Sequence, residues 1–247
     1  YRKDAGWIID GQHRFLGAIN AATDTEIPIV AFLGLDEEEQ IHQFITINKE
    51  AKGVPTSLYY DLLPRLRIKK TPAELAKERA GDIAQRLRKD EESAFYGKIV
   101  VTTSPKKGEL SLNNFIRKVT TLVNEQNGVL ATYSENEQAK IVDNFYKGLG
   151  KVFPREYSRI NSKFFQTLGF GALMNFFPYF FSATLKDRQA FTVDDVAEMF
   201  KEVSHFDFGA WASYGTGNNA ERQAGEDLKV EFDAALRTRE GEGGIKL

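Results

Sequence analysis

Residues 164–185 read FFQTLGFGALMNFFPYFFSATL, a stretch of 22 residues with seven phenylalanines and no charged side chain. A run of this length is long enough to span a bilayer. Gln166, Asn175 and Pro178 interrupt it, however, and its flanks carry the mixed charge of a soluble domain. We therefore predict a buried core helix here, and no association of the protein with a membrane.

Helical patterns extend on both sides of this run. Ser134 and Thr192 are each followed three residues later by an acidic residue, which is the pattern of a capping box at a helix N-terminus. Residues 98–102 read Lys-Ile-Val-Val-Thr, of which the last four are β-branched, and they predict one isolated strand. We expect residues 61–247 to form a predominantly helical body. The predicted helices are 55–67, 72–92, 112–126, 135–150, 162–186, 193–203 and 220–238.

Residues 1–60 have a different pattern, typical of a small α/β unit. The apolar runs 7–9 and 27–33 have the composition of buried strands. A helical spacing begins at Gln12, and Asp36 precedes a second helical stretch with an acidic first turn. The order strand, helix, strand, helix predicts a mixed fold class, α/β or α+β. We expect this unit to be truncated at its N-terminus, since few residues precede its first strand.

The composition excludes several classes of site. The chain has 247 residues, no cysteine and three histidines. Without cysteine it has no disulfide scaffold, no cysteine zinc site and no thiol nucleophile. Three histidines argue against a histidine metal site, so we predict no metal bound by the protein alone. A cysteine-free chain fits a reducing compartment, and we expect a cytoplasmic protein.

Charge is unevenly distributed along a chain whose formal net charge is −2. Residues 62–118 carry 14 basic and 7 acidic side chains, whereas the segments on either side are net acidic. A basic segment can follow a phosphate backbone, so DNA is a candidate partner. The alternative is a solvated helix surface with no partner. The candidate DNA-binding residues are Arg65, Arg67, Lys69 and Lys70.

The sharpest motif is Asp10-Gly11-Gln12-His13-Arg14, between the first predicted strand and the first predicted helix. Free N–H groups at a helix N-terminus favour an anion, and Gly11 and Gln12 lie where the backbone can approach it. Arg14 offers a planar fork to phosphate oxygens. His13 can transfer a proton near neutral pH, and Asp10 can hold Mg²⁺, His13 or a water. The motif predicts a phosphate or nucleotide site, for ATP or another nucleotide with Mg²⁺. The alternative is a capped turn with a surface arginine and a structural histidine.

The stretch Trp7–Gly17, which contains this motif, resembles the signature of the DGQHR-domain family. Its members include the DndB-like proteins of bacterial DNA phosphorothioate (sulfur) modification systems. The Gly-x-His-Arg core is also similar to the ParB/sulfiredoxin superfamily, in which this turn holds nucleotide phosphates. The resemblance implies a small ParB-like unit with a mixed sheet ahead of the helical body. It also implies a role in transcriptional regulation of a modification operon.

Two further segments resemble the family. Residues 44–48, followed by Lys52, look like its Phe-x-x-Ile-Asn segment. The resemblance implies that Asn48 helps to build the pocket, and Lys52 can add a phosphate contact. Trp211–Gly217 looks like a late glycine-rich element of the family. Where sulfiredoxin has a catalytic cysteine this chain has Gln12, so sulfiredoxin chemistry is excluded.

Gly215–Ala220 matches the pattern G-x-G-x-x-A, but no following βαβ unit supports a dinucleotide-binding fold. A loop leading into a helix at Ala220, with Arg222 in its first turn, can instead close over an anion. The alternative is a plain loop between helices.

Three functions remain open from the sequence. The first is an enzyme that hydrolyses or senses a nucleoside triphosphate, with Asp10 and His13 as catalytic residues. The second is a DNA-binding regulator that uses the basic segment. The third is a scaffold among other DNA-modification proteins, with a second copy of the chain as a further candidate partner.

Overall fold

The structure is a computed structural model, and it describes residues 6–51, 71–102 and 104–242. The chain divides into two compact units, Tyr1–Lys69 and Lys70–Leu247, which we call unit 1 and unit 2. The described part is mainly helical, with one small sheet. The predicted helix at 55–67 lies outside the described residues.

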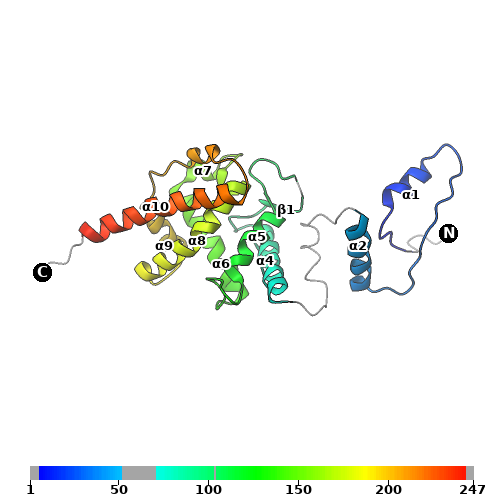
Figure 1. Cartoon of the computed structure of the whole chain (residues 1–247), viewed down its shortest axis with the longest axis horizontal. Coiled ribbons are helices and arrows are strands. Elements are labelled where there is room, and N and C mark those ends of the chain that lie inside the picture. The colour runs from blue at the N-terminus through cyan, green and yellow to red at the C-terminus, as the bar shows by residue number, and fades with distance from the viewer. Residues whose placement is uncertain (1–5, 52–70, 103, 243–247) are drawn as a thin grey trace. The chain divides into compact units, whose positions relative to one another are not determined.

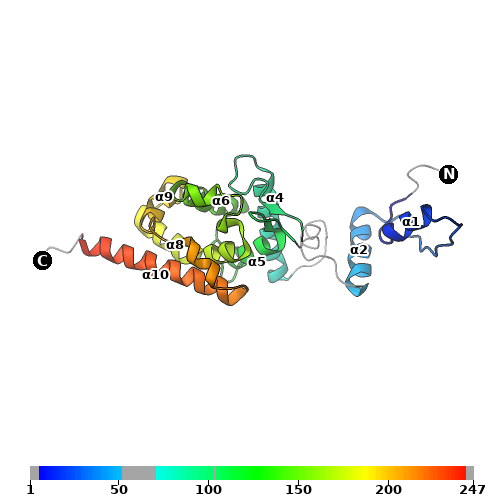
Figure 2. The same cartoon turned by 90° about the horizontal axis from the view of Figure 1, so that it is seen from above.

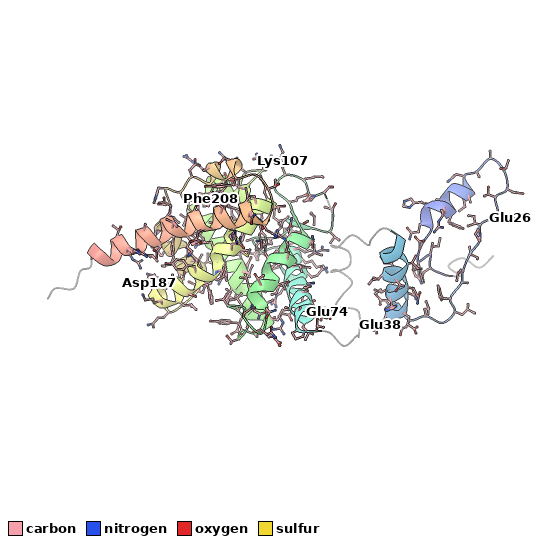
Figure 3. All side chains as sticks on the ribbon, in the orientation of Figure 1. Glu26, Glu38, Glu74, Lys107, Asp187 and Phe208 are labelled. Atoms are coloured by element: carbon pink, nitrogen blue, oxygen red, sulfur yellow. The ribbon has the colours of Figure 1, made fainter. Side chains whose placement is uncertain are left out.

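Unit 1 contains two described helices, α1 (Gln12–Ile19) and α2 (Glu37–Ala51). Asp36 starts α2 as predicted, because its Oδ1 accepts from the N–H of Glu39 at 2.8 Å while the Glu39 carboxylate accepts from the N–H of Asp36. This reciprocal pairing satisfies two N–H groups at the helix start. Figure 3 labels Glu38 in the acidic first turn of α2.

The two strand predictions in unit 1 are wrong. Residues 7–9 and 27–33 are irregular, and they expose apolar side chains, with Trp7 87% and Leu33 94% exposed. A strand requires a hydrogen-bonded neighbour, and no described segment pairs with either run. The described residues of unit 1 thus form no sheet, and the ParB-like mixed sheet that the resemblance implies is not confirmed.

Unit 2 is a helical body (Figure 1). The only sheet in the described residues lies here, as two short parallel strands pairing Ile99 with Leu110 and Val100 with Ser111. The predicted strand at 98–102 is thus shorter than expected and has a partner. The elements are α4 (Pro72–Lys89), β1 (Ile99–Val100), β2 (Leu110–Ser111), α5 (Leu112–Val123), α6 (Glu135–Val152), α7 (Pro154–Tyr157), η2 (Lys163–Phe165), α8 (Thr167–Arg188), α9 (Val193–Lys201), η3 (Phe208–Ser213) and α10 (Asn218–Glu242).

Local sequence signals set where these helices begin. Ser134 and Thr192 each form a complete capping box, at the start of α6 and of α9. Both boxes were predicted from spacing alone. Thr71 forms a third box with Glu74 at the start of α4, where Pro72 occupies the first helical position.

α8 is the central helix of unit 2. It packs against α10, α5 and α9, and both views show α10 lying along it (Figures 1 and 2). By length and composition it is the one described helix apolar enough to cross a membrane, but 61% of its most apolar window is buried inside the protein. The predicted core helix is therefore confirmed.

An aromatic core surrounds α8. Phe180 is fully buried and its ring lies 4.3 Å from that of Phe200 and 5.2 Å from that of Phe232, measured between centroids. Burying one such side chain stabilises a fold by about 1.5–3 kcal/mol. The fully buried large side chains include Phe95, Phe115, Phe145, Tyr146, Phe164, Phe165, Phe170, Phe176, Phe177, Phe180, Phe200, Trp211 and Phe232.

A buried ion cluster fastens the start of α10 to α5 and α8. The Glu221 carboxylate, 1% exposed, lies 2.7 Å from both the Arg117 guanidinium and the Lys118 Nζ. Lys118 also donates to Asn175 on α8 at 2.9 Å, and Arg117 donates to Asn218 at the first residue of α10. The cluster therefore holds in place the end of the glycine-rich loop that precedes α10.

Candidate functional site

The turn Asp10–Arg14 lies at the N-terminus of α1, as predicted. Gly11 is the N-cap and has φ 87°, in the left-handed region that favours glycine. Gly11 has no side chain, and no side-chain hydrogen bond caps the helix. The N–H groups of the first turn are therefore left for an external acceptor, and the helix dipole favours an anion there.

Arg14 folds back over this turn. Its Nη2 donates to Asp10 Oδ2 at 2.7 Å, and a Cβ placed on Gly11 would come within 3.3 Å of the same nitrogen. Glycine thus permits the guanidinium to lie close above the backbone. The Arg14 side chain is 74% exposed, and an ion pair this exposed contributes at most about 1 kcal/mol. An incoming anion can therefore compete with Asp10 for Arg14.

The neighbouring polar side chains also face solvent. His13 is exposed, and its imidazole is hydrogen-bonded to no described residue. Gln12 is exposed and donates weakly to the Ile8 carbonyl at 3.4 Å. The motif thus brings Asp10 and Arg14 together, whereas no hydrogen bond joins Asp10 to His13.

The described residues do not supply a ligand set for Mg²⁺. Within 6–51, 71–102 and 104–242, no group of three histidine, aspartate or glutamate side chains could hold a metal ion. Asp10 is the motif's only carboxylate, and Arg14 occupies one of its oxygens. Mg²⁺ needs several oxygen ligands, so at this turn they would have to come from phosphate and water.

Several predicted site residues lie beyond what the structure describes. Asn48 falls within α2, but its side chain is not described. Lys52 and the four candidate DNA-binding residues lie in the segment 52–70, outside the described residues. Their roles stay predictions.

Sequence reasoning missed a cleft of about 430 Å³ in unit 2. Its lining comes from three separate parts of the chain: the loop between β1 and β2, the segment from Lys163 of η2 to the start of α8, and the segment from Trp211 to Thr216. Only the glycine-rich loop had been singled out, as a candidate for closing over an anion. The other two parts carry no motif, since a lysine pair on a loop and an uncharged helix start are ordinary features of a sequence.

Arg222, the other residue proposed with that loop, does not line this cleft. It is exposed in the first turn of α10, next to the buried Glu221.

No protein-family model, no curated protein and no solved structure matches this chain in comparisons with known proteins.

Proposed function

We propose that the chain is a DndB-like, DNA-associated protein whose Asp10–Arg14 turn binds the phosphates of a nucleotide such as ATP. The observation that carries the proposal is an exposed guanidinium above a helix N-terminus that starts at glycine and has no side-chain cap. The resemblance of Trp7–Gly17 to the DGQHR-domain family supports the link to DNA phosphorothioate modification. On this proposal the protein acts in the cytoplasm, on DNA and alongside other modification proteins.

The geometry favours binding over hydrolysis as the role of the turn. The Arg14 guanidinium is hydrogen-bonded to the Asp10 carboxylate, and His13 has no described partner that would orient its ring for proton transfer. General acid–base catalysis needs such positioning. Hydrolysis of a nucleoside triphosphate and a purely scaffolding role are the alternatives that the experiments below separate.

Arg14→Ala is expected to weaken ATP binding about tenfold to a hundredfold, since a hydrogen bond to a charged group contributes about 1.5–3 kcal/mol. Titration calorimetry measures the affinity. Trp7 provides a second readout, because it lies three residues before Asp10 and Trp211 is the only other tryptophan. In a Trp211→Phe background, ATP should change the Trp7 emission.

Arg155→Ala is the matched control, because this exposed arginine lies in α7 of unit 2. It should leave ATP affinity unchanged. The proposal is contradicted if the unmodified chain does not bind ATP, or if both variants lose ATP affinity equally. The scaffolding role would then be the remaining alternative. Release of phosphate from ATP that stops in Arg14→Ala would instead establish the hydrolase.

Reversing the charges of Arg65, Arg67, Lys69 and Lys70 to glutamate is expected to weaken DNA binding and flatten its salt dependence. Each lost phosphate contact lowers the slope of log K against log salt by about 0.9, so four lost contacts lower it by about 3–4. Fluorescence anisotropy of a labelled duplex across a salt series measures the slope.

The control for that experiment reverses three exposed basic residues outside the basic segment: Lys140, Arg155 and Arg222. This variant should change the slope by less than one. A slope that stays the same in the first variant would show that the DNA contacts lie elsewhere.

A further inference from the structure

The cleft in unit 2 is lined by an excess of positively charged side chains, as expected of a site that binds an anion. Lys106 and Lys107 reach it from the loop between β1 and β2, and Lys163 reaches it from η2. Lys106 and Lys107 are exposed, and Figure 3 labels Lys107 on the outer surface of unit 2. None of the three ammonium groups forms an ion pair with a described residue.

Among the described residues that line the cleft, Glu109 is the only one with a carboxylate. One of its oxygens accepts from the backbone N–H of Lys106 at 2.9 Å, which fixes the turn that carries the lysine pair. The cleft therefore has three cations against one anion. A phosphomonoester carries a charge of about −1.5 to −2 at neutral pH, which matches this excess.

Hydrogen-bond donors other than the lysines also lie at the cleft. Thr167, Leu168 and Gly169 form the first turn of α8, and Gln166, the N-cap, makes no side-chain capping bond. Trp211 lines the cleft as well. The residue is 1% exposed, and its buried Nε1 has no hydrogen-bond partner among the described residues. Most buried polar groups in proteins are paired, so this indole N–H is a donor without its acceptor.

The third wall is the loop before α10. Gly215 and Gly217 have φ values of 78° and 92°, and no atom lies within 4 Å of a Cβ placed on either. The loop is thus open on its outer side, and the buried cluster around Glu221 holds its far end.

We propose that this cleft is a second binding site, for a phosphomonoester of mononucleotide size. Its volume of about 430 Å³ lies within the range of small-molecule sites, about 300–1,000 Å³, and is much larger than a phosphate ion needs. The three lysines bind the phosphate, and the rest of the ligand lies against the wall formed by Trp211 and the glycine-rich loop. All the residues that line the cleft belong to unit 2, whereas the Asp10–Arg14 turn belongs to unit 1.

The test uses AMP, inorganic phosphate and adenosine as probes of the full chain. In a Trp7→Phe variant, Trp211 is the single tryptophan and reports on the cleft. AMP should change its emission and release heat in calorimetry at millimolar concentration or below. Phosphate should bind more weakly than AMP, and adenosine should not bind, because it lacks the dianion.

The variant Lys106→Gln with Lys107→Gln is expected to weaken AMP binding at the cleft about a hundredfold, since each charged hydrogen bond contributes about a tenfold factor in affinity. Both residues are exposed on a loop, so the fold should be retained. Lys163→Gln, at a half-buried position, should weaken binding at least tenfold. The matched control is Lys140→Gln on α6, exposed and outside the cleft, which should change the affinity less than twofold.

Arg14→Ala separates this site from the proposed nucleotide turn, because it should leave the Trp211 response to AMP unchanged. The proposal is overturned if AMP changes neither the Trp211 emission nor the heat at millimolar concentration. It is also overturned if adenosine binds as well as AMP, or if Lys140→Gln weakens binding as much as the cleft variants.

Discussion

Replacing Glu221 with alanine is expected to lower the free energy of unfolding of unit 2 by about 3 kcal/mol or more, because the substitution leaves buried cations without their counter-ion. The Lys118 side chain is 10% exposed and cannot recover its hydration. Arg117 is 34% exposed, so water compensates part of its charge, and most of the cost comes from Lys118. Urea unfolding followed by circular dichroism measures the change.

Glu231→Ala is the matched control, since it removes the same side chain from the same helix. Glu231 lies 3.7 Å from His205 at the surface, with its side chain 53% exposed. Its loss should cost less than about 1 kcal/mol. Equal effects of the two variants would show that the buried cluster does not stabilise the fold.

The same cluster makes unit 2 sensitive to acid. Burial alone raises the pKa of Glu221, but hydrogen bonds and charge from Arg117 and Lys118 outweigh it, so the pKa lies below the ordinary value of 4.5. The carboxylate therefore contributes stability above pH 4.5, and this contribution is lost as the pH falls through the lowered pKa. The stability difference between the unmodified chain and Glu221→Gln should shrink as the pH falls below 4.5. A difference that is independent of pH would contradict this assignment.

Phe180→Ala is expected to destabilise unit 2 by about 3–5 kcal/mol, because it removes a fully buried ring and leaves a cavity between three helices. Its ring contacts Phe145 of α6, Phe200 of α9 and Phe232 of α10. Rigid, interlocked rings close such a cavity poorly, which places the cost toward the upper end of the range. The measurement is again the urea midpoint, together with the slope of the transition.

Val230→Ala on the surface of α10 is the control for this variant, and should change stability by less than about 0.5 kcal/mol. Phe180→Leu keeps part of the side-chain volume, so its loss of stability should lie between those of Phe180→Ala and Val230→Ala. This variant can still be measured if Phe180→Ala does not fold. A loss below 1 kcal/mol in Phe180→Ala would show that this aromatic cluster is not the core of unit 2.

Helix starts and the central helix were predictable because their signals are local. A capping box such as Ser134 with Glu137 closes within one helical turn, so its two residues need no other part of the chain. The uncharged run at 164–185 had to be buried somewhere, whatever packed against it. The glycine-led turn at Gly11 is local for the same reason.

The wrong strand predictions and the missed ion cluster both concern residues whose partners are distant in the sequence. Residues 7–9 have the composition of a strand, but a strand exists only when a neighbour pairs with it, and no described segment does. The ion partner of Glu221 lies 104 residues away, at Arg117, and no spacing rule connects them.

The sequence alone thus determined the helical body, its buried central helix and the glycine-led turn at the start of α1, because residues within a few positions of each other specify all three. Only the tertiary structure decided that Lys107, Lys163 and Trp211 share one cleft and that Glu221 is buried against two cations. Those arrangements depend on how helices pack across long separations, and packing is set by the shape and burial of all the contacting side chains together.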